Sequence, residues 1–386
     1  MNLTVLMNAG PWLSVPPDGY GGIETVVATL VPELRARGVR VVLATVGSST
    51  LPADDYLTVF DEPQFRSIGA PYNSVSGIAH AHMQGVLAYL REHGDVDVVH
   101  DHLEVVGPAV MAAMGGAAPP TLQTLHWDLR KHPDFYGTFD GCGRVRFAAV
   151  SQSQLDRAPT NLREQAIGIV PLAVPQPPQV PPAPTRGDQV VVLARITRDK
   201  GQDLAAHACR LAGVPLVLAG PVAGITEPAE LYAHLEDPAD PLHAHPDVRF
   251  FLDEVAPLVD GDGVRWVGGV AGSQKEELLG SARALLAPNR WAEPGATGVV
   301  EALGRGVPVV ATSLGVLPSL VCHGVTGYLA DDVAQIADYL GQLDAIAPEA
   351  CRASVASWTP AAMAGGYLDL YSTLAASNRV PKVAVR

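Results

Sequence analysis

Glu293 and Glu301 lie eight positions apart in the stretch WAEPGATGVVEALGRGVPVV, residues 291–310. The first lies in a Pro/Gly turn and the second in a predicted helix. The residues between them include four small ones, Gly295, Ala296, Thr297 and Gly298. A small-residue backbone at a helix start can approach a ligand and offers unpaired N–H groups to an anion. Because the glutamates repel phosphate but accept hydrogen bonds from hydroxyls, the stretch fits a nucleotide sugar.

A second candidate stretch, VVLARITRDKGQDL, covers residues 191–204. A strand is predicted to end at Arg195 and a helix to begin near Gly201, with Lys200 between them. Arginine binds phosphate oxygens through its fork, and lysine adds a compact charge. Lysine is rare in this chain, so we expect Arg195 and Lys200 to hold a diphosphate and Arg198 to be an ordinary solvated loop charge.

A third stretch, PPDGYGGIETVVATLVPEL, follows the first predicted strand and begins a helix. Open α/β sheets bind ligands at this position. Gly21 and Gly22 could approach a phosphate or a sugar, or the stretch could be an ordinary strand-to-helix turn. It does not have the GxGxxG spacing of a dinucleotide site.

Short runs rich in Val and Leu alternate with longer amphipathic segments, the pattern of parallel strands joined by helices. The predicted strands cover residues 3–8, 39–46, 96–100, 120–126, 146–151, 166–171, 189–194, 214–220, 248–251, 264–268, 283–288 and 307–312. This order predicts an α/β protein with two doubly wound, Rossmann-like domains that face each other across a cleft.

A proline-rich stretch at 171–188 predicts an interdomain linker, because neither a helix nor a central strand tolerates so many prolines. We therefore expect an N-terminal domain over 1–175, on the acceptor side, and a C-terminal nucleotide-sugar domain over 186–360. A last helix, 361–378, could pack back toward the N-terminal domain.

Composition narrows the class of protein. The 386 residues carry a formal net charge of -14, which argues against nucleic acid or an anionic membrane surface as the main partner. The four cysteines form no CxxC pair, so neither a disulfide framework nor a zinc site is indicated. The N-terminus lacks signal-peptide features and no segment has transmembrane length, so we expect a cytoplasmic protein. The oligomeric state stays open.

These stretches together resemble the retaining glycosyltransferases of family 4, which have the two-domain GT-B fold. ARITRDKG is similar to the family's diphosphate motif, and EPGATGVVEALGRGVPVVAT to its Glu-x7-Glu signature. PPDGYGGIE resembles its glycine loop, DVVHDH and TLH resemble its short strand motifs, and GVTGYL its late turn. The matches occur in the family's order from residue 3 to about residue 330.

The resemblance implies roles for five side chains. Glu293 would bind hydroxyls of the donor sugar, and Glu301 would bind the ribose. Arg195 and Lys200 would bind the diphosphate, and His126 would lie near the donor sugar. From the sequence alone, His126 could equally be a strand-end histidine with satisfied hydrogen bonds.

The resemblance also implies backbone contacts to the donor. Gly21 and Gly22 would lie beside the diphosphate and Val267 and Gly268 near the base. Amides would come from Gly295, Ala296 and Thr297. Many family members have Phe-Gly where this chain has PGAT at 294–297, which leaves the donor sugar open.

Several other polar groups could carry chemistry. DVD at 95–97 and DGD at 260–262 imitate a metal-binding DxD motif, but the first leads into a strand and the second lies in a turn. We interpret both as structural and expect no obligatory metal. We expect an acceptor-side polar edge at residues 100–102, with His102 the side chain of this run that reaches the cleft. Tyr136 could stack on an acceptor or pack in the core.

The sequence thus predicts a metal-independent retaining glycosyltransferase of bacterial type. It would move a sugar from a nucleoside diphosphate sugar to an acceptor hydroxyl on a small molecule, natural product or cell-envelope glycan, with no other cofactor. The alternatives are a sugar-nucleotide epimerase or a phosphorylase on the same fold, or a non-catalytic sugar-binding protein. A nicotinamide-dependent oxidoreductase should show GxGxxG, which the first glycine stretch lacks.

Overall fold

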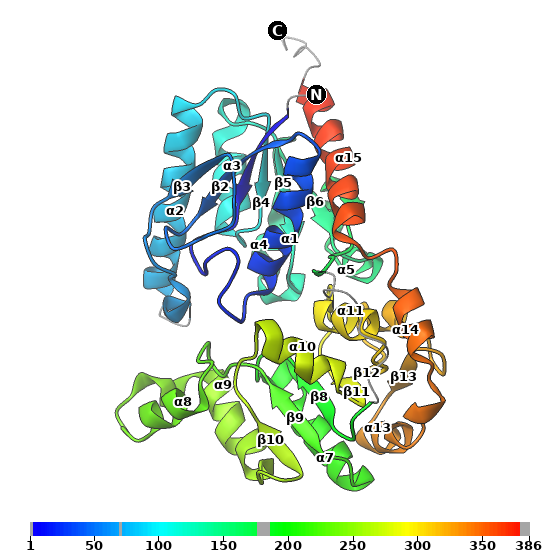
Figure 1. The fold of residues 1–386 in the computed structure, drawn as a ribbon. Coiled ribbons are helices and arrows are strands. Elements are labelled where there is room, and N and C mark those ends of the chain that lie inside the picture. Colours follow the sequence, from blue (N-terminus) through cyan, green and yellow to red (C-terminus); the bar gives the residue numbers. More distant parts are fainter. Residues whose placement is uncertain (1–2, 69–71, 176–185, 379–386) are drawn as a thin grey trace. The chain divides into compact units, whose positions relative to one another are not determined.

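The computed structural model describes residues 3–68, 72–175 and 186–378 (Figure 1). Contacts divide the chain into two compact units. The chain leaves the first unit after Val174 and returns to it after Trp358. Most of the proline-rich stretch, 176–185, lies outside the described residues. No helix in the described ranges is both long enough and apolar enough to cross a membrane.

The first unit is built on a parallel sheet of seven strands in the order β3-β2-β1-β4-β5-β6-β7. The strands are β1 Thr4–Asn8, β2 Arg40–Thr45, β3 Asp55–Thr58, β4 Val98–Asp101, β5 Thr121–Leu125, β6 Val145–Ala149 and β7 Ala166–Ile169. This order is the doubly wound order of Rossmann folds, extended by one strand. The predicted fold class is confirmed for this unit.

Helices cover both faces of the first sheet because successive strand residues point to opposite sides. Val5 and Met7 of β1 join one hydrophobic core, and Leu6 joins the other. The α-helices are α1 Gly22–Ala36, α2 Tyr72–Glu92, α3 Val106–Met114, α4 Pro133–Thr138, α5 Gln152–Asp156, α6 Thr160–Gln165 and α15 Pro360–Asn378. Three short 3-10 turns are Phe65–Ser67, Gly115–Ala117 and Leu129–Lys131. Helices α1 and α15 line the first core, and α2, α3, α4 and α6 line the second.

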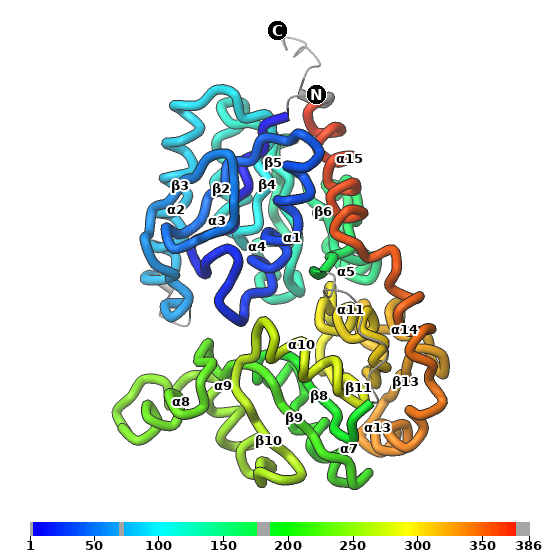
Figure 2. The backbone as a smooth tube through the Cα atoms, viewed as in Figure 1, coloured from blue at the N-terminus to red at the C-terminus, as the bar shows by residue number. Residues whose placement is uncertain are grey.

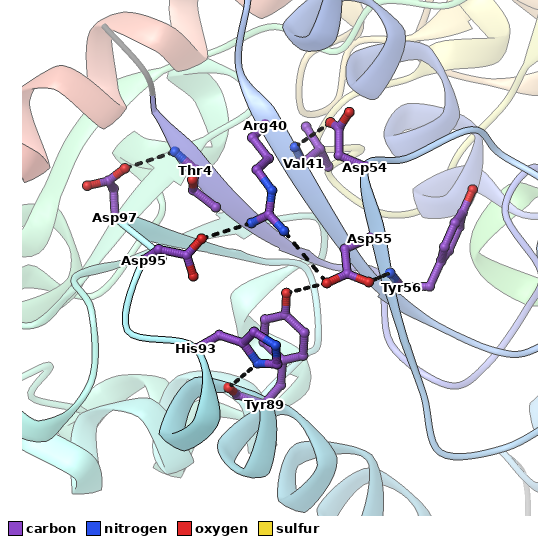
Figure 3. Close-up of polar contacts among 10 residues, drawn as sticks. All are labelled: Thr4, Arg40, Val41, Asp54, Asp55, Tyr56, Tyr89, His93, Asp95 and Asp97. Carbon is purple, nitrogen blue, oxygen red and sulfur yellow. Dashed lines mark hydrogen bonds and ion pairs between the residues drawn. The ribbon is translucent and has the colours of Figure 1, made fainter.

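The amino ends of the first strands are joined by polar contacts (Figure 3). The guanidinium of Arg40 lies between two carboxylates, 3.2 Å from Asp95 and 3.7 Å from Asp55. Asp97 accepts a hydrogen bond of 2.8 Å from the backbone N–H of Thr4. Asp95 and Asp97 of the DVD sequence therefore bind groups of the chain itself. Because the Arg40 pairs are exposed, each contributes at most about 1 kcal/mol.

The second unit contains a parallel sheet of six strands in the order β10-β9-β8-β11-β12-β13. The strands are β8 Val190–Leu193, β9 Leu216–Ala219, β10 Val264–Trp266, β11 Ala284–Ala287, β12 Val309–Thr312 and β13 Gly327–Ala330. Counted from β8, this is again the Rossmann order.

The DGD sequence binds groups of the chain itself, as DVD does. Asp260 accepts hydrogen bonds from the N–H groups of Asp262 and Val264 within its own turn.

The helices of the second unit connect its strands. The α-helices are α7 Gln202–Ala212, α8 Pro228–Leu235, α9 Pro246–Phe250, α10 Gly272–Gly280, α11 Thr297–Gly304, α12 Leu317–Leu320, α13 Val333–Leu340 and α14 Pro348–Ser354. Short 3-10 turns are η4 Arg198–Lys200, η5 Pro241–Ala244, η7 Ala256–Leu258 and η8 Leu343–Ala345, and η6, Phe251–Val255, is a π-helix.

Three elements differ from the predicted pattern. Residues 248–251 were predicted as a strand, and this is wrong because they belong to α9 and η6. Pro246 at the first helical position and His245 as its cap start a helix there. Strands β3 and β13 are additional: each has a single Leu and no Val, so neither reads as an apolar run.

The C-terminal helix α15 is fixed to the first sheet by buried hydrogen bonds. It runs beside α1 in Figure 2 and contacts β4, β5 and β7. Tyr371 lies 2.6 Å from Nδ1 of His100, and Nε2 of His100 lies 2.8 Å from the hydroxyl of Thr124. Tyr367 bonds the same hydroxyl at 3.0 Å. Burial holds the pKa of His100 well below its usual value, so the imidazole is neutral and uses both nitrogens.

We expect Tyr371→Phe to lower the free energy of unfolding by about 1–3 kcal/mol, because a buried ring nitrogen of His100 would lose its partner. Chemical denaturation at neutral pH measures this. Tyr232→Phe is the matched control, since Tyr232 is 48% exposed, and it should change stability by less than about 0.5 kcal/mol. Equal effects of the two substitutions would contradict the role of this network.

Candidate functional site

The candidate site lies where the strand order of the second sheet reverses, between β8 and β11. Ligands of open α/β sheets bind outside the carboxyl ends of the strands at this switch point. The loop after β8 carries Arg195 and Lys200, and the loop after β11 carries Glu293. Because β8 and β11 are parallel neighbours, both loops leave the sheet at the same edge.

Lys200 and Glu293 form an ion pair between these two loops. They are 93 residues apart in sequence. Their side chains are only 20% and 12% exposed, so the pair is screened less than a surface pair. The structure therefore joins two residues that the sequence assigned to different parts of one ligand.

Glu293 receives two further donors on the same oxygen. Its Oε2 accepts hydrogen bonds of 2.8 Å from Nδ2 of Asn289 and 3.0 Å from Nε1 of Trp291. Nζ of Lys200 also lies over the indole of Trp291, 5.0 Å from the ring centroid, within cation–π distance. No donor among the described residues bonds Oε1 of Glu293, so this oxygen can accept from a ligand.

A second ion pair fastens the same two loops. Arg290 binds both carboxylate oxygens of Asp203 in α7, at 2.7 and 2.5 Å. Its side chain also donates to the carbonyl of Arg198 at 3.0 Å, and its backbone N–H donates to the carbonyl of Asp199 at 2.8 Å. Bidentate geometry restricts both partners, so the loops are held at a fixed distance.

Two glycines allow the backbones to approach at this edge. Gly201 has φ of +70°, and a Cβ there would lie 2.1 Å from the carbonyl oxygen of Pro288. Gly315 has φ of +64°, and a Cβ there would lie 2.3 Å from backbone atoms of Glu293. Val316 donates to the carbonyl of Glu293 at 2.8 Å. Any side chain at Gly315 would therefore displace Glu293.

The start of α11 has no side-chain cap from its N-cap residue. Its N-cap, Ala296, has left-handed backbone angles, φ 48° and ψ 48°, and gives no side-chain cap. The first residues of the helix, Thr297 and Gly298, therefore lack a capping acceptor from Ala296. Glu301 is the fifth residue of α11, too far along for a capping box.

Glu301 instead binds a neighbouring helix. It is buried, and its Oε1 lies 3.1 Å from Nζ of Lys275 in α10. Its Oε2 is also buried and has no partner within the described part of the chain. Such an atom is costly unless a donor reaches it. Arg305 and Glu276 add a bidentate pair between the same two helices.

The remaining predicted residues of this unit lie around the same edge. The carbonyl of Arg195 accepts from the side chain of Gln202 at 2.7 Å, which ties the loop to α7. Val267 and Gly268 follow β10, two strands away from β8. Gly268 has φ of +74°, and its carbonyl accepts from Gly220 at 2.6 Å. The structure thus places Val267 and Gly268 further along the sheet edge than Lys200.

Gly21, Gly22 and His126 lie in the first unit. Gly21 is the N-cap of α1, and Gly22 is its exposed first residue with open space around it. His126 follows β5, and its Nε2 lies 2.7 Å from Nδ1 of His102. Burial lowers the pKa of His126 to about 3, so it acts as a neutral imidazole.

Two expectations about side chains of the first unit are resolved by burial. His102 was expected to be accessible from the acceptor side, but it is 1% exposed and lies between His126 and Met7. Tyr136 is 1% exposed and packs in the core, so it cannot stack on an acceptor.

Sequence reasoning missed several residues that shape the site. Asn289 and Trp291 precede Glu293 by four and two positions, and a polar run directly after an apolar strand was an available signal. The rarity of lysine could equally have drawn attention to Lys275. Nothing local in the sequence links Arg290 to Asp203, because the pair depends on the packing of two distant loops.

Two family models match the chain. The model for glycosyl transferases group 1 matches residues 176–347, and the model for glycosyltransferase family 4 matches residues 20–171. The chain is 25% identical over 342 residues to a phosphatidyl-myo-inositol mannosyltransferase of Mycobacterium leprae, covering 84% of this chain and 83% of that protein.

Solved structures of glycosyltransferases have a similar fold. AviGT4, a glycosyltransferase involved in avilamycin A biosynthesis, is 25% identical, with a TM-score of 0.64 over 97% of this chain and 98% of that one. HepE of Anabaena, solved in complex with UDP and glucose, is 16% identical, with a TM-score of 0.65 over 96% of this chain and 100% of that one. With the two Rossmann-like sheets and the paired family models, these matches show that the chain is a glycosyltransferase that belongs to family 4 and has the GT-B fold.

Proposed function

We propose that this glycosyltransferase is a retaining enzyme that moves a sugar from a nucleoside diphosphate sugar to an acceptor hydroxyl. The observation that carries the proposal is the ion pair of Lys200 and Glu293 at the switch point of the second sheet. A cation for phosphate and a carboxylate for hydroxyls lie together there, beside the uncapped start of α11. HepE, solved with UDP and glucose, supports a nucleoside diphosphate donor.

We assign the donor's parts to separate residues. The diphosphate would bind Arg195, Lys200 and the amides at Thr297. The ribose would bind Glu301, whose buried Oε2 lacks a partner in the described residues. The sugar would bind Oε1 of Glu293. The backbones of Ala296, Gly295, Val267 and Gly268 would complete the donor contacts from this unit.

Leaving-group stabilisation is the main catalytic task in this proposal. The bond from the anomeric carbon to the phosphate oxygen breaks, and the acceptor oxygen forms a bond on the same face. The acceptor proton passes to the departing phosphate oxygen. Charge gathers on the diphosphate, and preorganised cations and amide dipoles offset it without a metal. His126 of the first unit, held neutral, would act through a hydrogen bond rather than through charge.

The cation assignment predicts the effect of Arg195→Ala and of Lys200→Ala. Each should lower kcat about 100-fold, because each removes charge stabilisation of about 3 kcal/mol at a developing anion. Arg198→Ala is the matched control, since it removes the same charge from an exposed position in the same loop. Steady-state kinetics of the variants measures the effect on kcat, and wild-type rates in the Arg195 and Lys200 variants would contradict the cation assignment. Kinetics of the wild type with EDTA tests whether a metal is needed, and loss of activity there would contradict the proposal that no metal takes part.

The two glutamates should fail in different ways. Glu301→Gln should weaken binding of the whole nucleotide, including the free nucleoside diphosphate, because the ribose loses an acceptor. Glu293→Gln should leave affinity for the free diphosphate nearly unchanged but lower kcat and blur donor choice, since a misplaced sugar loses its attack geometry.

Calorimetry with UDP, GDP, TDP and ADP, alongside kinetics with the matching sugars, separates the two effects. If both variants weaken the free diphosphate equally, the division between ribose and sugar is wrong. If neither changes binding or rate, the carboxylates are structural, and the donor site lies elsewhere.

A further inference from the structure

One carboxylate oxygen of Glu293 is bound by three donors of different kinds. Oε2 contacts the ammonium of Lys200, the amide of Asn289 and the indole N–H of Trp291. The lysine belongs to the loop after β8, and the two neutral donors belong to the loop of Glu293 itself. The carboxylate therefore keeps two hydrogen bonds even when Lys200 turns away.

Trp291 touches both members of the ion pair. Its Nε1 donates to Glu293 at 3.0 Å, and its ring lies 5.0 Å from the ammonium of Lys200. An aromatic face attracts a cation without binding it in one geometry. Lys200 can thus move between the carboxylate and another anion while it stays close to the ring.

A diphosphate at this edge would compete with Glu293 for Lys200. Glu293 would then be a largely buried carboxylate beside an anion, and like charges close together are unfavourable. A neutral donor that stays on Oε2 lowers this cost and keeps the free Oε1 in place for a hydroxyl.

We infer that Trp291 is a positioning residue: its indole N–H holds Glu293 toward the donor sugar when Lys200 binds the diphosphate. This inference rests on the proposed function, because it assumes that Lys200 and Glu293 serve two parts of one donor. If Trp291 served only to pack the loop, its substitution would lower the stability of the protein, and the size of its effect would be the same whether residue 293 is Glu or Gln.

Trp291→Phe tests the inference because it removes the N–H donor and keeps a smaller aromatic face for Lys200. We expect kcat to fall about tenfold, donor choice to blur, and affinity for the free nucleoside diphosphate to stay within about twofold of wild type. Trp358→Phe is the control of the same chemical type, since in the described part of the chain no hydrogen bond or ring contact joins the Trp358 side chain to this site.

A double-mutant cycle decides whether Trp291 acts through Glu293. If it does, kcat of the double variant Trp291→Phe, Glu293→Gln should be within about twofold of Glu293→Gln alone. If the double variant instead loses kcat by the product of the two single losses, Trp291 does not act through Glu293, and the inference is wrong. The proposed donor site would not be affected by that result. If the wild-type chain binds none of UDP, GDP, TDP and ADP, both the proposed function and this inference are wrong.

A spectroscopic measurement covers the case in which Trp291→Phe does not fold. The chain has five tryptophans, and each gives one indole N–H signal in a nitrogen-15 NMR spectrum. In Glu293→Gln one indole signal should shift, because its acceptor changes from a carboxylate to an amide. Five unchanged signals would overturn the contact on which the inference depends.

Discussion

The ion pair of Lys200 and Glu293 is the contact on which the candidate site depends, because it joins the loops that leave two neighbouring parallel strands. Parallel pairing brings both loops to the same edge, but it does not set the distance between them. That distance is fixed by Arg290 and Asp203, and by the close backbone approach at Gly201. Because both side chains are largely buried, loss of one partner would leave the other charge uncompensated.

In the absence of a ligand, an ion pair compensates the charges of a site that is built to bind a charged ligand. Without a partner, Lys200 and Glu293 would each carry the cost of partial burial alone. In the proposed function, a diphosphate would take over the lysine, and a sugar hydroxyl would take over part of the carboxylate. Glu301 and Lys275 repeat the arrangement between α10 and α11, with one carboxylate oxygen left buried and unpartnered in the described residues. Among the described residues, each carboxylate thus has one oxygen bound by donors of the chain and one without a donor.

Much of the fold was predictable, because buried parallel strands read as Val-rich and Leu-rich runs separated by helices. The run at 248–251 was misassigned because a short apolar segment has no clear period, and Pro246 decided the outcome by starting a helix. Lys200 and Glu293 were singled out from residue type and loop position, and their role in binding a donor stays a prediction. Trp291 and Asn289 were not singled out, and the pair of Arg290 with Asp203 could not be, because it forms only when distant loops pack. His102 is buried. The types of the neighbouring residues do not indicate whether a position at a strand end is buried or exposed.

A crystal structure of the chain with a nucleoside diphosphate sugar would test the central claim most directly. The diphosphate should lie between Lys200 and the start of α11, with the ribose at Glu301 and the sugar at Oε1 of Glu293. Lys200 should then contact a phosphate oxygen, while Trp291 still donates to Glu293. A donor bound elsewhere, with the Lys200 and Glu293 pair undisturbed and no ligand atom near Thr297, would contradict the claim.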